Sequence, residues 1–424
     1  MKELFYNKYI KNISWLAFEK FIKTLLGGLV SVFIIRYFGP NEFGILSYAN
    51  SIVGILFVIS KLGFDQILVQ KLTENSSQKE VILSSSIFFR LITSFFLFLI
   101  YFILVKNFSD SKENIILYIL GASIFFSSFN FIDQYFQSQV KNEYIVKANL
   151  FASVIITILK FCLILFKQDL ETYVKILLFE TFLISTFYVF FLVEKGDFDL
   201  KKIKLKLYIP FEIFERSWLL MISGVAITIY TKIDQIMIKE MLTNDAVGQY
   251  GAAVRLSEFF YFIPVIIINT FFPSLVKNFN NDFFNKRLEY LYYFAIIFSS
   301  LLFIFFYFSS DRLIYFALGN DFSETPAIFN LYLATIFFVF VGMINNSILI
   351  LYKLEKYIFY LTIITVIINI VLNYFFITWF GLMGAVYSTL ATYSFSGIFV
   401  YFFLKKTRFI FYLNLKTFLK YLQP

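Results

Sequence analysis

The sequence predicts an all-α integral membrane protein that crosses the bilayer twelve times in two six-helix bundles. Three observations lead to this prediction. Hydrophobic residues make up 59% of the chain, aromatic residues 22% and charged residues only 15%, a composition outside the range of soluble domains. The apolar residues gather in stretches of membrane-spanning length, and one loop motif occurs twice with an offset of 204 residues, from Gly44 to Gly248.

A helix needs about 20 apolar residues to span a bilayer, and the chain divides into segments of that length with little remainder. The predicted spans are Asn12–Ile35, Glu42–Ser60, Val81–Val105, Ile115–Tyr135, Tyr144–Phe166, Tyr173–Val193, Ile213–Ile238, Ala246–Val276, Leu291–Ser309, Pro326–Leu351, Ile358–Phe380 and Gly384–Leu404.

The distribution of positive charge predicts the topology, because short cytoplasmic loops accumulate Lys and Arg. With the N-terminus inside, cytoplasmic Lys and Arg exceed those on the other side by more than three to one. Both termini are therefore expected in the cytoplasm. The same bias explains the net charge of +9 without a nucleic acid partner.

The longest polar insertion follows the sixth span and contains a run of lysines, which suggests a solvated linker; a basic segment lying on anionic lipid is the alternative. The predicted organisation is an N-terminal six-helix bundle at residues 1–194, a cytoplasmic linker at 195–212, a C-terminal six-helix bundle at 213–404 and a basic cytoplasmic tail at 405–424.

The repeated motif connects the first two spans of each half. Aligning Gly44 with Gly248 also pairs Asn41 with Asp245 and Ala49 with Ala253. Because each half contains an even number of crossings, the halves are expected to be parallel repeats. In the first copy we expect Gly39 to adopt a positive φ before Pro40, and in both copies the central glycine should allow close helix packing.

The residue inventory argues against an enzyme. Histidine is absent, which removes the usual general base and the commonest metal ligand. Cys162 is the single cysteine and has no partner for a disulfide. The sequence also lacks a nucleotide-binding loop. No cofactor, metal site or catalytic residue is therefore predicted.

Four stretches of the chain carry a resemblance to a known family: "IIRYFGPNEFGILSYA" at residues 34–49, "FDQIL" at 64–68, "DQYFQSQVKNEYI" at 133–145 and "YTKIDQIMIKEMLTNDAVGQYGAA" at 230–253. With them the sequence resembles the Wzx-type O-antigen and polysaccharide flippases of the multidrug/oligosaccharidyl-lipid/polysaccharide exporter (MOP) superfamily. The resemblance implies two lobes around a central cavity and transport of undecaprenyl-pyrophosphate-linked sugar repeat units across the bacterial inner membrane. It also implies membrane lipids, a polysaccharide polymerase and a chain-length regulator as partners.

Charged residues within the predicted spans are the candidates for function, because a charge in hydrocarbon is costly and usually faces protein or water. Arg90 lies near the middle of its span without an acid within one helical turn. A guanidinium can bind phosphate oxygens in bidentate fashion. We therefore expect one arginine from each half, Arg90 and Arg255, to contact the substrate pyrophosphate, with further positive potential from Lys20, Lys23, Lys160 and Lys232.

Three acids, Asp234, Glu258 and Glu180, are candidates either for binding a coupling proton or sodium ion or for forming ion pairs. In the second interpretation Asp234 would pair with Arg255, Lys232 with Glu258, and Lys160 with Glu180. Snorkelling to the interface is an alternative for Lys20 and Lys160.

Two other functions fit parts of the sequence. A multidrug or organic-cation antiporter of the same superfamily would share the architecture, but its cavity should be acidic or apolar. A membrane polysaccharide polymerase would need a large outer loop or a histidine base, and the sequence has neither. Movement of a charged head group through a wet cationic cavity by alternating access remains the preferred prediction.

Overall fold

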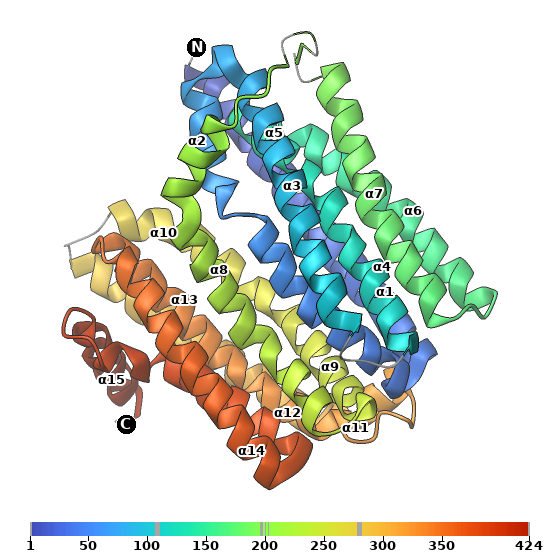
Figure 1. Cartoon of the computed structure of the whole chain (residues 1–424). Coiled ribbons are helices and arrows are strands. Elements are labelled where there is room, and N and C mark those ends of the chain that lie inside the picture. The colour runs from blue at the N-terminus through green and yellow to red at the C-terminus, as the bar shows by residue number, and fades with distance from the viewer. Residues whose placement is uncertain are drawn as a thin grey trace. The chain divides into compact units, whose positions relative to one another are not determined.

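The chain is helical throughout the part that the structure describes. The computed structural model describes residues 2–106, 111–195, 198–199, 201, 203–277 and 282–422, and every regular element in these ranges is a helix (Figure 1). The α-helices are α1 Lys2–Ser60, α2 Phe64–Glu74, α3 Lys79–Lys106, α4 Ser111–Ser127, α5 Phe131–Ser138, α6 Asn142–Leu165, α7 Leu170–Lys195, α8 Tyr208–Met241, α9 Asn244–Glu258, α10 Phe262–Lys277, α11 Asp282–Leu318, α12 Thr325–Leu333, α13 Thr335–Leu351, α14 Glu355–Gly397 and α15 Arg408–Leu422.

Ten apolar stretches among the described residues are long enough to cross a membrane. Two of them are long enough for two passes and contain a glycine with non-helical backbone angles. Gly39 has φ 69° within α1, and Gly381 has φ 59° within α14. Both breaks lie where the sequence predicts a hairpin between spans. The ten stretches are therefore consistent with twelve crossings.

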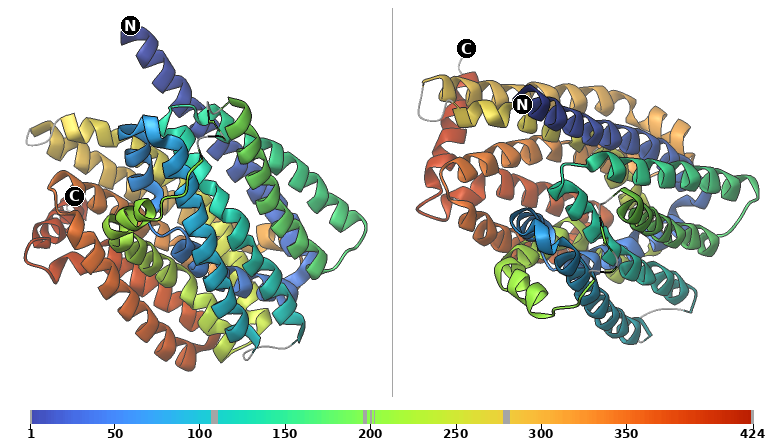
Figure 2. Two further views of the ribbon diagram at one scale, coloured as in Figure 1. Left: turned by 45° about the horizontal axis from the view of Figure 1, so that its top comes forward. Right: turned by 90° about the horizontal axis from the view of Figure 1, so that it is seen from above.

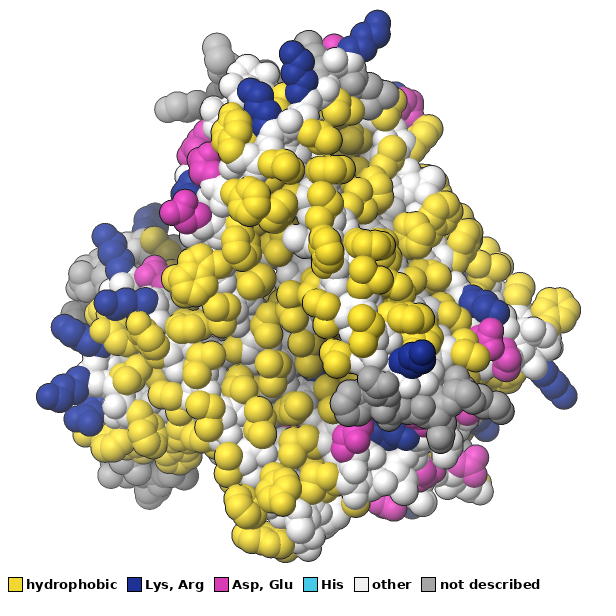
Figure 3. All heavy atoms as spheres, in the orientation of Figure 1, with side chains coloured by type: hydrophobic (Ala, Val, Ile, Leu, Met, Phe, Trp, Pro, Cys, Tyr) yellow, Lys and Arg dark blue, Asp and Glu magenta, His cyan; other side chains and the backbone are white. Residues whose placement is uncertain are grey.

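The outer surfaces of these helices are strongly apolar. Large hydrophobic side chains such as Phe96, Ile103, Phe308 and Trp379 are more than half exposed. On the face shown in Figure 3, hydrophobic side chains predominate and the charged ones gather toward the edges. Such surfaces are unfavourable in water and are expected where a protein faces lipid.

Contacts divide the chain into two compact units. Unit 1 contains residues 1–37 and 49–228, and unit 2 contains residues 38–48 and 229–424. Two helices, α1 and α8, each contribute residues to both units. The division falls within α8, after the 195–212 segment at which the sequence places its domain boundary.

In unit 1, α4 packs against α3 and α7, and α6 packs against α7. The second predicted span ends at Ser60, as α1 does, and a break at residues 61–63 separates it from α2; Leu62 and Gly63 in this break both have positive φ. This break is held by α8. The Ser217 hydroxyl donates to the Leu62 carbonyl at 2.8 Å, and a Cβ at Gly63 would come within 2.5 Å of the Ser217 carbonyl oxygen.

In unit 2, α13 packs against α14, and α9 packs against α12. Buried residues of α11, α13 and the end of the chain form its core, including Tyr292, Phe340, Ile344 and Tyr401. The C-terminal helix α15 lies across the direction of α11 (Figure 2). Its Ile410 belongs to the same core, whereas Tyr412 on the opposite face is exposed.

The two copies of the repeated motif pack against each other within unit 2. A Cβ at Gly44 would overlap the carbonyl oxygen of Asn244, and a Cβ at Gly248 would overlap the carbonyl oxygen of Pro40. Pro40 and Asn244 occupy equivalent positions at the offset of 204 residues, so the contact is reciprocal. The predicted close approach at both glycines is therefore present, and each copy supplies the other's partner.

Candidate functional site

A buried carboxylate is the centre of the polar cluster in unit 2. Asp234 of α8 is 3% exposed. Its Oδ1 accepts hydrogen bonds from the amides of Asn373 at 2.6 Å and Asn369 at 3.4 Å, and its Oδ2 accepts from the hydroxyls of Tyr250 and Thr389, each at 2.7 Å. None of these partners is charged. The carboxylate charge is therefore compensated by dipoles alone, an arrangement that favours uptake of a proton or a cation.

The local sequence explains how three elements meet at this carboxylate. Asn369 and Asn373 lie four residues apart in α14, so both amides point from one face of the helix. The break at Gly381 reverses the chain and brings Thr389 of the second arm of α14 to the same point. Tyr250 reaches the cluster from α9, and its hydroxyl also lies 2.8 Å from that of Thr389.

Two oxygen atoms of the cluster lack partners. The side-chain Oδ1 atoms of Asn369 and Asn373 are buried and accept no hydrogen bond from the described residues. A buried acceptor without a donor costs free energy, about 1–3 kcal/mol in typical cases. Their amide nitrogens face the carboxylate, so these oxygens would join it as hard ligands for a cation only after the amides turn.

The ion pairs expected in this region form only in part. Lys232 Nζ lies 3.7 Å from Glu258 Oε1, as one interpretation of the sequence requires. The other expected pair, Asp234 with Arg255, is absent because Asp234 is surrounded by the neutral donors. Arg255 lies in the last turn of α9 with an exposed side chain, and it has no hydrogen-bond or ion-pair partner among the described residues.

Arg90, the corresponding arginine of unit 1, is enclosed by protein. Its side chain is 1% exposed. One guanidinium nitrogen donates to the Ser127 hydroxyl at 3.4 Å, and the group lies 4.6 Å from the centre of the Phe131 ring, a cation–π distance. Its Nε has no partner among the described residues. In this conformation Arg90 has no accessible surface for a phosphate group.

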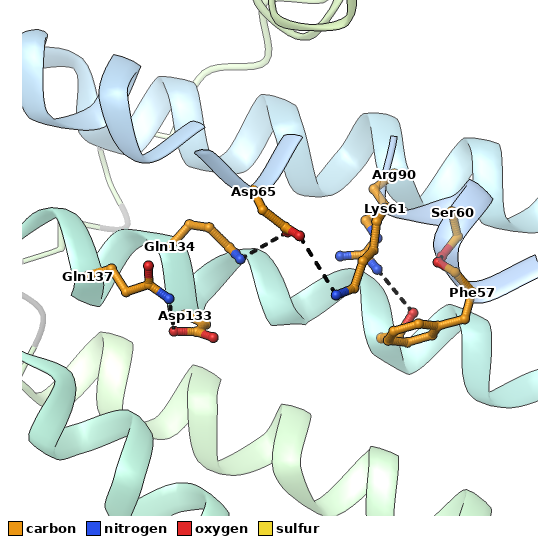
Figure 4. Close-up of polar contacts among 9 residues, drawn as sticks. Phe57, Ser60, Lys61, Asp65, Arg90, Asp133, Gln134 and Gln137 are labelled. Carbon is orange, nitrogen blue, oxygen red and sulfur yellow. Dashed lines mark hydrogen bonds and ion pairs between the residues drawn. The ribbon is translucent and has the colours of Figure 1, made fainter. Parts of the chain in front are cut away.

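A second polar cluster lies around Arg90 at the break between α1 and α2 (Figure 4). Asp65, at the start of α2, lies 3.7 Å from Lys61 and accepts a hydrogen bond from Gln134 at 3.1 Å. It also interacts electrostatically with Arg90. Asp133 of α5 accepts a hydrogen bond from Gln137 at 2.8 Å. Two cations and two acids thus lie around the break, where helix ends leave backbone groups to be satisfied.

Most of the remaining candidate cations are paired. Lys23 lies 3.1 Å from Glu19, and Lys160 lies 3.3 Å from Glu180, the pair predicted for that region. The side chain of Lys20 lies outside the described residues. Three of the four lysines each have an acid beside them, so their positive potential is offset locally. Among the candidate cations whose side chains the structure describes, Arg255 is the one that is exposed and has no acid beside it.

Several residues of these clusters were not selected from the sequence. Lys61, Asp65 and Asp133 fall at span ends, where charges are common, so only their clustering in space reveals them. Asn369 and Asn373 carry a sequence signal: with Thr365 they repeat every four residues in an otherwise apolar span. Polar residues with helical periodicity indicate one buried polar face.

Comparisons with known proteins identify the family. The model of the family described as polysaccharide biosynthesis protein matches residues 9–279. A search of curated protein sequences found no match. Among solved structures, the fold is similar to that of an inward-facing multidrug resistance MATE family transporter of the MOP superfamily, with a TM-score of 0.72, 13% identity and coverage of 95% of this chain and 99% of that chain.

The lipid II flippase MurJ in an inward closed conformation is equally similar, with a TM-score of 0.71, 16% identity and coverage of 97% of this chain and 92% of that chain. A mutant of the Vibrio cholerae MATE transporter VcmN matches with a TM-score of 0.61, 11% identity and coverage of 97% and 98%. These structures share the fold, and the family match confirms the resemblance seen in the sequence. The chain is a member of the family described as polysaccharide biosynthesis protein.

Proposed function

We propose that the protein is a flippase that moves undecaprenyl-pyrophosphate-linked oligosaccharide repeat units from the cytoplasmic to the outer leaflet of the bacterial inner membrane. The product would serve the synthesis of O-antigen or another surface polysaccharide, with the polymerase and chain-length regulator as neighbours. Both termini would face the cytoplasm. The family match over residues 9–279 is the observation that carries this proposal.

A flippase for such a lipid has to overcome the desolvation of its diphosphate head group. A diphosphate head group cannot enter hydrocarbon without losing its hydration, and the desolvation of even one ion costs several kcal/mol or more. A translocator must therefore present groups that replace water around the head group. The exposed and unpaired guanidinium of Arg255 is suited to this role, because its planar donors match two phosphate oxygens at once.

The two arginines would act at different stages. Arg255 is exposed in the present conformation, whereas Arg90 is covered by Ser127 and Phe131. In the proposed cycle Arg90 contacts the pyrophosphate only after α3 and the following helices separate enough to expose it. Three lysines would contribute as well, because each could leave its acidic partner and bind a phosphate group instead. They are Lys23, Lys160 and Lys232.

Asp234 would couple transport to a cation gradient. Among the described residues no cation pairs with Asp234, while Glu180 and Glu258 lie beside lysines. Binding of sodium would use the carboxylate and, once their amides rotate, the two unpartnered oxygens of Asn369 and Asn373, whereas a proton would need the carboxylate alone. The surplus of acceptors favours sodium over a proton.

Deletion of the gene tests the proposal. We expect lipid-linked repeat units to accumulate in the cytoplasmic leaflet and surface polysaccharide to disappear, and the wild-type gene to restore both. Arg255→Ala should fail to restore them at normal protein level, while Arg255→Lys, which keeps the charge and loses the bidentate geometry, should restore them in part. Restoration by Arg255→Ala would remove that residue from the mechanism.

The antiporter alternative is tested in the same strains. A multidrug transporter would change the efflux of cationic dyes and leave lipid-linked sugars unaffected. Because the MATE structure and MurJ match the fold equally well, only such a measurement separates the two functions. Dye efflux that depends on this gene, with normal surface polysaccharide, would refute the flippase assignment.

A further inference from the structure

Unit 2 contains a pocket of about 220 Å³ next to the Asp234 cluster. It lies between α8, α13 and both arms of α14, and all of its lining residues belong to this unit. Its walls are aromatic in part, with the rings of Tyr230, Phe338, Tyr393 and Tyr401. None of the described residues that line it is charged.

The polar groups of the pocket are hydroxyls and one amide, from Asn346, Thr362, Thr365 and Ser396. The two threonine hydroxyls donate to carbonyls of their own helix and keep lone pairs that can accept. Asn346 is exposed and has no hydrogen-bond partner among the described residues. The pocket therefore offers both donors and acceptors to a ligand.

Two tyrosine hydroxyls are also available. Tyr230 and Tyr393 contact each other edge to face, with ring centres 6.1 Å apart, and neither hydroxyl has a hydrogen bond to another described residue. A buried tyrosine hydroxyl usually has a partner. These two groups are thus free to bind a ligand that enters the pocket.

Size and chemistry together restrict the ligand. Pockets for drug-sized molecules measure roughly 300–1,000 Å³, and this one, at about 220 Å³, is smaller. A lipid diphosphate would need a cationic side chain, which the lining does not provide. A pyranose ring has apolar C–H faces that pack on aromatic rings and hydroxyls that both donate and accept.

We propose that this pocket binds one uncharged sugar ring of the lipid-linked oligosaccharide, a neutral hexose or an N-acetylhexosamine. The proposal rests on the proposed function and adds a glycan site to it. The pocket and the cation cluster share α14: Thr365 lines the pocket one turn before Asn369, and Tyr393 follows Thr392, which accepts a hydrogen bond from Asn369 at 3.2 Å. Sugar binding and cation binding would therefore affect the same helix.

Binding to defined lipids tests the proposal. The purified protein in nanodiscs is titrated with undecaprenyl diphosphate and with the same lipid carrying glucose, galactose, N-acetylglucosamine or N-acetylgalactosamine, and complexes are measured by native mass spectrometry. The wild type should bind at least one sugar-bearing lipid about tenfold more tightly than the bare lipid, as expected for one or two neutral hydrogen bonds.

Thr362→Phe fills the pocket without removing a contact to another helix, because the Thr362 hydroxyl bonds only to Ile358 of its own turn. This variant should lose the preference for the sugar and keep the affinity for the bare lipid. Ile367→Phe is the matched control, since Ile367 lies on the same helix and is 58% exposed. It should behave like the wild type. Asn346→Leu provides a second test and should weaken the preference.

The outcomes separate the two proposals. An unchanged preference in Thr362→Phe and Asn346→Leu, or a wild type that binds all the lipids equally, would overturn the glycan site and leave the flippase proposal standing. A wild type that binds neither bare nor sugar-bearing lipid would overturn both.

Discussion

Replacement of Asp234 by Asn should separate stability from ion coupling. The substitution keeps the size of the side chain and removes its charge. The new amide meets the Tyr250 and Thr389 hydroxyls with its oxygen, at the position where Oδ2 accepts at 2.7 Å from each. Its nitrogen can donate to the unpartnered oxygens of Asn369 and Asn373 once their amides rotate.

The magnitude follows from these contacts. In Asp234→Asn most hydrogen bonds are replaced, and we expect a loss of about 1–2 kcal/mol, the difference between charged and neutral hydrogen bonds. In Asp234→Leu the Thr389 hydroxyl can still donate to the Ala385 carbonyl, and the Tyr250 hydroxyl can donate to that of Thr389 at 2.8 Å, but Asn373 loses its acceptor. At about 1–3 kcal/mol for a buried unsatisfied donor, the loss is about 1–3 kcal/mol.

The assay is the thermal midpoint of the purified protein, measured by fluorescence-detected size-exclusion chromatography with and without sodium. Sodium at a concentration of about 100 times its dissociation constant should stabilise the wild type by about 2.7 kcal/mol. Asp234→Asn should show a midpoint below that of the sodium-free wild type, by the equivalent of about 1–2 kcal/mol, and no response to sodium, and it should not restore surface polysaccharide. Potassium at the same ionic strength is the control for general salt effects.

Two results would refute this reasoning. A sodium response in Asp234→Asn equal to that of the wild type would place the ion elsewhere. Full restoration of polysaccharide by Asp234→Asn would show that the charge is not needed, and the cluster would then be a purely structural hydrogen-bond network. A wild type that responds to a change of pH and not to sodium would assign the site to a proton.

Three further predictions follow from packing and charge. Gly44→Ala should destabilise the protein by at least about 1–3 kcal/mol, because the new Cβ would overlap the Asn244 carbonyl. The control Gly54→Ala has open space around the new methyl group and should be neutral or stabilising by up to about 1 kcal/mol. Equal thermal midpoints for the two variants would contradict the close packing at Gly44. Ser217→Ala should lower the stability by about 1–3 kcal/mol, because the Leu62 carbonyl loses its donor. In the control Ser223→Ala the lost hydroxyl bonds only its own helix. A fall in the thermal midpoint no larger than in this control would argue that α8 does not stabilise the break at residues 61–63. Arg255→Ala should leave the free energy of unfolding within about 0.5 kcal/mol of the wild-type value and should weaken the binding of undecaprenyl diphosphate. A large loss of stability would indicate a structural role.

Much of the fold follows from the sequence because the membrane imposes strong local constraints. Length and hydropathy locate the spans, since a helix is the simplest structure that satisfies its backbone in lipid. The turn at Gly39 could be predicted because a positive φ before a proline favours glycine, and the structure has φ 69° there. The end of the second span at Ser60 was predicted, and α1 ends there. The positive φ of Leu62 just beyond it could not be predicted, because it depends on contacts with α8 and not on the residue type.

The charged residues show where such prediction ends. Ion pairs between neighbouring spans, Lys160 with Glu180 and Lys232 with Glu258, could be anticipated from depth along the helices. The surroundings of Asp234 could not, because Asn373 and Thr389 are far away in sequence and reach it only through the reversal at Gly381. The enclosure of Arg90 by Ser127 and Phe131 is likewise a result of packing.

The sequence by itself determined that this is a helical membrane protein built from a duplicated unit, because hydropathy and repeat spacing are properties of the chain alone. Only the tertiary structure decided that the two copies of the motif pack against each other, with the Pro40 and Asn244 carbonyls on opposite glycines. It also decided which charges are neutralised by partners and which remain available. The physical reason is that side-chain energies within a membrane protein depend on the nearest groups in space, and helix packing chooses those groups from distant parts of the chain.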